Sequence, residues 1–150
     1  MIQNLHNLKK SPRVLINASA IGFYGSHAQN KFTDSVGNNN SASNTFSWTY
    51  DSTSPTMTIS SSTVNSGETS NDSTISLTFT SSERTTNFIN NDITISGGSL
   101  SSLSGSGTTY TATLIPSGDA TYTISVAQNK FTDSAGNNNN ASNTFTWTYD

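Results

Sequence analysis

The stretch AQNKFTDSVGNNNSASNTFSWTYD at residues 28–51 returns at residues 127–150 as AQNKFTDSAGNNNNASNTFTWTYD, with 21 of 24 positions identical and an offset of 99 residues. A repeat spacing the size of one small domain is typical of a tandem array. We therefore interpret residues 52–150 as one complete repeat, and residues 28–51 as the end of a repeat whose first three quarters are missing. The function to expect is that of an array member.

The composition is polar but weakly charged, with 31% hydrophobic and 10% charged residues in a chain of 150. This hydrophobic content suffices for one thin core but not for two. Polarity without charge often accompanies disorder. In this chain, however, the apolar residues alternate with Ser and Thr in short runs, as half-buried strands require. We therefore expect residues 52–150 to fold.

Alternation with a period of two recurs along the repeat. Met57 and Ile59 alternate with Thr in PTMTIS, and the aromatic residues of TFTWTY do the same. Further strands are expected at residues 74–80, 92–96, 110–114, 122–126 and, more weakly, around Leu100 and Leu103. The runs are separated by the turn sequences NSGETSND, SGG, SGSG, PSGD and DSAGNNNN. About seven short strands without a helical period predict an all-β antiparallel sandwich with Trp147 in its core.

Charge is unevenly placed. The charged residues within 1–27 are all basic, whereas residues 52–150 carry seven acids and two basic residues. The seven acids are Glu68, Asp72, Glu83, Asp92, Asp119, Asp133 and Asp150. This balance argues against nucleic acid as a partner, because such binding needs a basic face, and it favours cations. No run approaches the roughly 18 apolar residues of a membrane span, so we expect no membrane insertion.

Catalytic groups are scarce in the repeat. The chain has no Cys, and its two His residues, His6 and His27, lie before residue 52. Neither a Ser-His-Asp nor a Cys-His arrangement can therefore be built within the repeat, and no disulfide can form. We expect no enzymatic activity. A paired-carboxylate hydrolase is the remaining catalytic alternative.

The segments DSTSPTMTISS, LTFTSSE, NFINNDITISGGSL and YTATLIPSGDATYTISVAQNKFTDSAGN, followed by FTWTYD, occur in this order. In combination they resemble the bacterial Ig-like repeats found in tandem in very large surface adhesins and biofilm-associated proteins. The resemblance covers residues 52–150 and, as a partial copy, residues 28–51. It implies an Ig-like β-sandwich, an extracellular or cell-surface location, and a structural, spacing or adhesive role. It also implies neighbouring Ig-like repeats as partners, with cell-surface or matrix components bound through other domains.

Turns rich in acids and Asn make calcium the leading chemical hypothesis. Calcium takes six to eight oxygen ligands from carboxylates, carbonyls and water, and such turns supply them. The candidate ligands are Asp51, Glu83 after the second strand, Asp92 before the third, Asp133, Asn137 and Asp150. Asp51 and Asp150 are equivalent by the 99-residue offset, so an ion at each junction would stiffen an array. The alternative is that Asp133 and the Asn run only form a turn through side-chain-to-backbone hydrogen bonds.

The Thr-rich strands suggest an alternative function. A flat, exposed row of Thr or aromatic residues can bind carbohydrate or ice, which would make the repeat a binding module. Thr is also simply a favourable strand residue on a solvated face.

Residues 1–27 differ from the repeat in composition. The run VLINASAIGF is apolar without alternation, as in a parallel strand buried on both faces. The stretch SPRVLINASAIGFYGS is similar to a strand and loop of the nucleotide-sugar epimerases among the short-chain dehydrogenases, and this resemblance implies that Ser19 matches their active-site Ser/Thr. The Gly-x-Gly-x-x-Gly turn and the Tyr-x-x-x-Lys pair of such an enzyme are missing, so we assign no activity to this segment.

The chain is thus expected to contain three parts: a non-integrated segment 1–27, the partial repeat 28–51 and the complete repeat 52–150. Both 28–51 and its C-terminal copy could in principle fill the last-strand place of the sandwich. From Tyr50 to Pro55 the chain reaches at most roughly 17 Å, whereas the two poles of such a strand lie roughly 20 Å apart. We expect the C-terminal copy to hold this place, and residues 28–51 to be extended, flexible or paired at an exposed edge.

Overall fold

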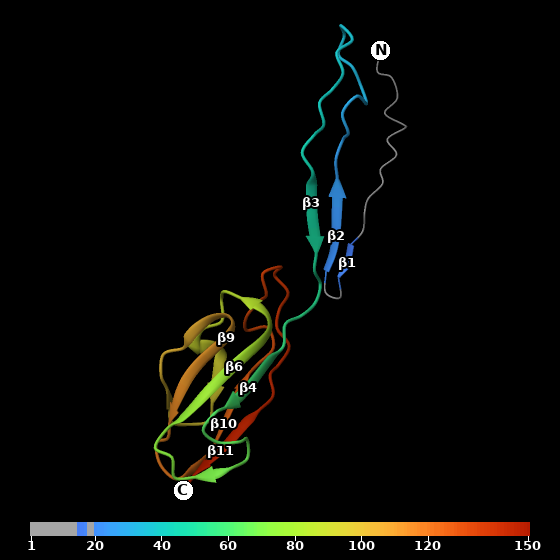
Figure 1. Ribbon diagram of the computed structural model, residues 1–150. Coiled ribbons are helices and arrows are strands. Elements are labelled where there is room, and N and C mark those ends of the chain that lie inside the picture. Colours follow the sequence, from blue (N-terminus) through green and yellow to red (C-terminus); the bar gives the residue numbers. More distant parts are fainter. Residues whose placement is uncertain (1–14, 18–19) are drawn as a thin grey trace. The chain divides into compact units, whose positions relative to one another are not determined.

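The computed structural model describes residues 15–17 and 20–150 (Figure 1). The chain divides into two units, residues 1–53 and 54–150. Within the described residues the first unit holds one sheet and the second holds two.

The first sheet of the second unit has the strand order β4-β6-β9-β8. Its strands are β4 (Met57–Ser61), β6 (Ile75–Thr85), β9 (Ser104–Ile115) and β8 (Ser99–Leu100), and every neighbouring pair is antiparallel. Along β6, Ile75, Leu77 and Phe79 are buried, while the Ser and Thr residues between them point to the opposite face. This alternation is the one that the sequence predicts.

The second sheet has the order β5-β11-β10-β7. Its strands are β5 (Thr69–Ser70), β11 (Phe145–Tyr149), β10 (Ala120–Val126) and β7 (Ile93–Ile95), and the 3₁₀ turn η1 (Asn90–Asp92) leads into β7. Strand β10 is antiparallel to both of its neighbours. Strand β11, the C-terminal copy of the repeated stretch, therefore holds the expected last-strand place.

The core lies between these two sheets and consists of alternate strand residues. Its largest fully buried side chains are Trp147, Phe79, Phe131 and Phe145. Trp147 is 0% exposed, stacks on Tyr122 with ring centroids 5.7 Å apart, and donates a hydrogen bond from Nε1 to Ser70 Oγ at 2.9 Å. The prediction that Trp147 is a core residue is thus confirmed, and so is the Ig-like β-sandwich.

Two turn predictions were wrong. Residues 69–70, within the predicted turn NSGETSND, form β5 and pair with β11 in parallel, so the sandwich is not wholly antiparallel. The turn before β5 is fixed by Glu68, whose carboxylate accepts hydrogen bonds from Asn65. The backbone of Gly67 and Glu68 also forms hydrogen bonds with that of Thr146 and Thr148.

The SGSG sequence belongs to β9 rather than to a turn. Gly105 has a φ of +115°, and a Cβ atom at this position would lie 2.3 Å from the carbonyl oxygen of Thr109. The glycine therefore permits a close backbone approach within a bent strand instead of ending the strand.

The first unit contains a sheet of order β1-β2-β3, with β1 (Leu15–Asn17), β2 (Ala20–Gly25) and β3 (Phe46–Tyr50). Strand β3 comes from the partial repeat and pairs antiparallel with β2. Part of the partial repeat, which the sequence predicts to be extended, flexible or paired at an exposed edge, is thus paired with residues 20–25. The physical reason is that an extended copy of the last strand offers backbone groups that any adjacent extended segment can pair with.

Among the described residues, no helix has the length and apolar character needed to cross a membrane.

Substituting Trp147 with Ala tests the assigned core. Removal of a buried Trp costs about 3–5 kcal/mol, so the melting temperature should fall by more than about 10 °C. Trp48, the equivalent residue of the partial repeat, is 52% exposed, and Trp48→Ala should leave the melt of the sandwich nearly unchanged. Deleting residues 1–50 should likewise preserve the cooperative transition. A protein with both Trp48→Ala and Trp147→Ala that melts like the parent would show that the core is wrongly assigned.

Candidate metal centre

Asp133 organises the loop that follows β10. Its Oδ1 accepts hydrogen bonds from the backbone N–H groups of Ala135 at 2.8 Å, Gly136 at 2.7 Å and Asn137 at 2.9 Å. The side-chain amide of Asn137 donates to Oδ2 at 2.9 Å. Gly136 has a φ of +97°, which glycine adopts without strain. The side-chain-to-backbone turn that the sequence suggests is therefore present, with a buried carboxylate at its centre.

The same loop forms in the partial repeat around Asp34. Oδ1 of Asp34 accepts from the backbone N–H groups of Val36 at 2.9 Å and Asn38 at 3.0 Å, and the Asn38 amide donates to Oδ2 at 2.9 Å. Asp34 is exposed, whereas Asp133 is buried. The shared geometry in two different surroundings shows that the local sequence sets this loop.

Hydrogen bonding keeps the Asp133 carboxyl ionised. Burial raises its pKa, but the bonds from the Asn137 side chain and from the backbone N–H groups of Asn137, Gly136 and Ala135 together outweigh burial, so that the pKa lies below its ordinary value. The pKa of Asp34 is also lowered, chiefly by the Asn38 side chain. A negative charge therefore stands at the centre of the loop at neutral pH.

Asn139, which the sequence analysis did not single out, anchors the base of this loop. It is 2% exposed, and its Oδ1 accepts from the backbone N–H groups of Lys130 at 2.7 Å and Phe131 at 2.9 Å. Its amide donates to the carbonyl oxygens of Ala127 and Asn140. The side chain of Asn139 thus ties the two ends of the loop together. Only its place in a run of four Asn residues could have drawn attention to it.

Glu83 and Asp133 come together through a backbone bridge. Glu83 lies within β6 and not after the strand as expected, because β6 continues to Thr85 beyond a register shift against β9. Thr85 forms an isolated antiparallel bridge with Asp133. This bridge holds the Asp133 loop against β6, two residues from Glu83.

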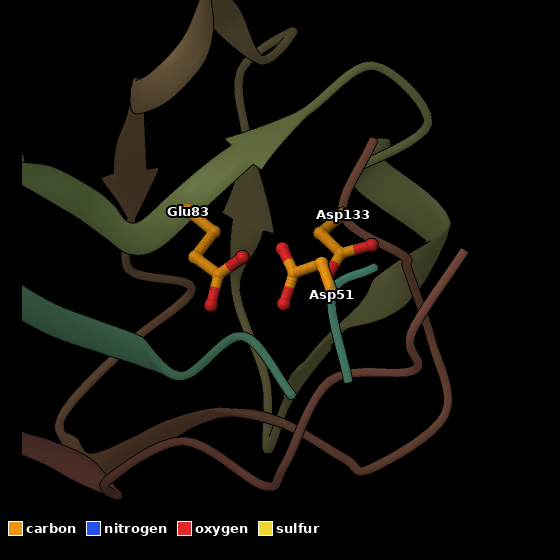
Figure 2. A group of neighbouring side chains, drawn as sticks. All are labelled: Asp51, Glu83 and Asp133. Atoms are coloured by element: carbon orange, nitrogen blue, oxygen red, sulfur yellow. The ribbon is translucent and has the colours of Figure 1, made fainter. Parts of the chain in front are cut away.

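Asp51 completes the acidic group. Its Oδ1 accepts a hydrogen bond from the backbone N–H of Thr53 at 3.0 Å. Asp51, Glu83 and Asp133 each offer one carboxylate oxygen, and these three oxygens lie within 4.8 Å of one another. Figure 2 shows the carboxylates of Glu83 and Asp51 facing one another, with that of Asp133 beside Asp51. Three of the six predicted ligands are thus brought together.

Such an arrangement carries an electrostatic cost. Two unit charges 4.8 Å apart repel by about 1 kcal/mol in bulk water and by about 3–4 kcal/mol at an effective dielectric constant near 20. Asp133 is buried and the other two acids are half-buried, so solvent screens the group only in part. A divalent cation bound by these three oxygens would replace this repulsion by attraction.

The donor atoms suit a hard cation. All three are carboxylate oxygens, and residues 54–150 contain neither His nor Cys, the side chains that zinc prefers. Calcium needs six to eight oxygens, so backbone carbonyls and water would supply the rest of its shell. Asn137 is placed to orient Asp133, because its amide nitrogen donates to that carboxylate.

The remaining candidates lie elsewhere. Asp92 ends the 3₁₀ turn η1, where its Oδ2 accepts a hydrogen bond from the backbone N–H of Ile89 at 2.9 Å. Asp150 is exposed after β11, and its backbone N–H donates to the Ser70 carbonyl. Neither belongs to the group of three acids. Ser19, the position of the epimerase resemblance, lies outside the described residues.

Residues 51–149 match the family model of the bacterial Ig-like domain. The match covers more than half of the chain, and the chain therefore belongs to this family. It begins at Asp51, so that all three clustered acids fall within the matched segment. Comparison with curated proteins and with solved structures gave no match.

Acid unfolding tests the role of the Asp133 carboxylate. A pKa lowered by folding stabilises the protein above the pKa of the unfolded chain, about 3.9, and this contribution is lost as pH falls through the folded-state pKa. In chelator, Asp133→Asn should be less stable than the parent at pH 7, and the two should converge below about pH 4. Asp119→Asn, at an exposed acid, is the matched control and should follow the parent. A constant difference between Asp133→Asn and the parent from neutral pH down to full protonation would contradict the assignment.

Proposed function

We propose that this Ig-like domain is a structural spacer repeat of a bacterial cell-surface or secreted adhesin, and that it supports adhesion or biofilm formation by positioning binding domains located elsewhere. Calcium, held by Asp51, Glu83 and Asp133, stiffens the repeat. Family membership, the 99-residue repetition and the buried core support the spacer role. The role is mechanical and not catalytic.

The convergence of the three carboxylates is the observation on which the calcium proposal rests. Glu83 is fixed by β6 and Asp133 by its loop, so the two acids do not need to be gathered by the ion. A partly prearranged set of oxygens loses less conformational freedom when it binds a cation. Because repulsion among the acids is present only in the folded state, an ion that binds that state relieves it and adds stability.

The repeat spacing extends the proposal to an array. Asp150 follows β11 at the position equivalent to Asp51, 99 residues earlier. If another repeat followed, Asp150 would take the place before that repeat that Asp51 takes before this one. Each repeat boundary would then bind one ion. A row of such boundaries resists bending better than a row of uncharged linkers, which suits a spacer at a cell surface.

A second candidate function rests on the outer face of the β4-β6-β9 sheet. The register aligns Thr58, Thr80 and Thr109 across the three strands, and Ser60, Thr78 and Thr111 form the next row. Most of these side chains are exposed. Rows of hydroxyl groups on adjacent strands could bind a polysaccharide or ice, which would make the repeat itself a binding module. Thr111→Lys would abolish such binding in a polysaccharide pull-down or an ice recrystallisation assay while leaving the melt unchanged.

A thermal melt in chelator and in millimolar calcium tests the calcium proposal. Calcium at a hundredfold excess over Kd should add about 2.7 kcal/mol, a rise in melting temperature of roughly 10 °C or more. Magnesium should stabilise less, because it demands a tight octahedral shell that loosely gathered carboxylates do not supply.

Variants distinguish loss of ion binding from loss of folding in this test. Glu83→Gln should keep the melting temperature in chelator at or above that of the parent, since it removes repulsion, and should lose most of the rise with calcium. Asp119→Asn and Asp92→Asn should keep the full rise. Absence of a calcium-dependent rise in the parent would reject calcium as the ligand and leave these acids as turn and surface residues.

A further inference from the structure

The partial repeat exposes the side chains that its copy buries. Phe46 and Trp48 on β3 are 68% and 52% exposed, whereas the equivalent Phe145 and Trp147 on β11 are 1% and 0% exposed. Phe32 is also exposed, at 63%. Such a group of aromatic residues on one strand and its preceding loop is a surface that a partner would cover.

Strand β3 lies at the edge of its sheet within the described residues, and its one pairing repeats that of β11. It pairs with β2 from Ile21 opposite Tyr50 to Gly25 opposite Phe46. In the sandwich, β11 pairs with β10 from Ala120 opposite Tyr149 to Ile124 opposite Phe145. Both members of every pair are shifted by the 99-residue offset. Strand β2 thus occupies the place of β10 beside the partial repeat, while no strand occupies the place of β5 in this part of the structure.

We propose that residues 28–50 form a donor strand that enters the last-strand place of a second copy of this chain. In the exchanged state, β3 of one copy lies between β10 and β5 of the other copy and replaces its β11. The partner surface is therefore the same one that β11 already covers in the sandwich, and its complementarity to this sequence is visible there.

The donor is already folded in the form that the partner needs. Oδ1 of Asn40 accepts hydrogen bonds from the backbone N–H groups of Lys31 and Phe32 at 2.7 and 3.1 Å. Oδ1 of Asn139 accepts the equivalent bonds from Lys130 and Phe131 at 2.7 and 2.9 Å. The Asp34 loop likewise reproduces the Asp133 loop. Little ordering of the donor is then required on docking, which favours association.

The three positions that differ between the copies do not affect this fit. Val36 and Ser41 replace Ala135 and Asn140, both of which are exposed in the sandwich, and the third difference exchanges Ser47 for Thr on the outward face of the strand. On exchange, five residue pairs with β2 are replaced by five with β10, so the main-chain pairing is conserved. The donor strand β3 gains the parallel pairing with β5 and the burial of its aromatic side chains, and the displaced β11 loses the same contacts, so the two strands compete for one place with nearly equal contacts.

The exchange must occur between chains. Pro55 lies at the pole where its carbonyl accepts from Asn140, whereas Tyr149 and the end of β11 lie at the opposite pole beside Ser70. The four residues between Tyr50 and Pro55 span at most about 17 Å, less than the roughly 20 Å length of such a strand. A chain therefore cannot insert its own β3 into its own sandwich.

In the parent the attached β11 has the higher effective concentration and keeps the place, so the parent should be monomeric at micromolar concentration.

Weakening β11 should reveal the exchange. Trp147→Ala in the full chain lowers the affinity of the resident strand, while the donor keeps Trp48, so the exchange equilibrium should shift by at least about a hundredfold. Sedimentation from low to high micromolar concentration should then show dimers or longer head-to-tail species for Trp147→Ala, and monomers for the parent and for Trp48→Ala. The double variant Trp48→Ala with Trp147→Ala should not associate specifically.

Cysteine cross-linking tests the same exchange in a chain whose core is intact. The chain has no native Cys. A chain with Tyr50→Cys mixed with a chain carrying Ala120→Cys should form a disulfide-linked heterodimer under mild oxidation, because the exchanged register places these positions opposite one another. Thr111→Cys, on the outer face of the other sheet, is the control acceptor and should give at least tenfold less.

Equal heterodimer yields for the Ala120→Cys and Thr111→Cys acceptors would overturn the proposal. So would association of Trp147→Ala that is unaffected by adding Trp48→Ala, since it would reflect unfolding and not strand exchange. A monomeric Trp147→Ala protein over the whole concentration range would have the same consequence.

Discussion

The insertion of β11 between β10 and β5 is the interaction on which the rest of the sandwich depends. It places Phe145 and Trp147 in the core and closes the second sheet. The same insertion fixes the segment before it, so that Phe131 is buried and the Asp133 loop is held against β6. The position of the acidic group therefore follows from the packing of a strand that ends at the opposite pole.

The two copies of the repeated stretch separate what local sequence decides from what tertiary packing decides. The loops around Asp34 and Asp133 share their hydrogen bonds, because these depend on residues within four positions of the acid. Burial of the aromatic side chains differs completely, because it depends on β5, β10 and the facing sheet. Nearly identical sequences thus fold alike locally and differ in burial, because burial depends on the packing of neighbouring strands and not on propensity.

Much of the fold could be predicted from the sequence, because alternation of apolar residues with Ser and Thr identifies strands such as β6 and β10 directly. Strand β5 could not, since two residues inside a polar turn carry no period and are made a strand only by β11. The extension of β9 through SGSG also escaped prediction, because Gly105 serves a close backbone approach that leaves no mark in the sequence except the glycine itself.

For the candidate site, the sequence predicted the type of residue but not which of the acids lie together. Acids beside turns pointed to Glu83 and Asp133, yet only the bridge between Thr85 and Asp133 shows that they meet. Sequence proximity to a turn does not reveal which loops share a pole of a sandwich.

The central claim is that the two repeated segments differ in burial because only one of them occupies the last-strand place of the sandwich. Hydrogen exchange of both segments in the native chain tests this claim most directly. Peptides from the segments differ in mass through Val36 and Ala135, and through Ser47 and Thr146, so both can be followed in one sample. We expect amides of residues 145–149 to exchange only with global unfolding, and those of residues 46–50 to exchange at least about a hundredfold faster at neutral pH. Equal protection of the two segments would contradict it.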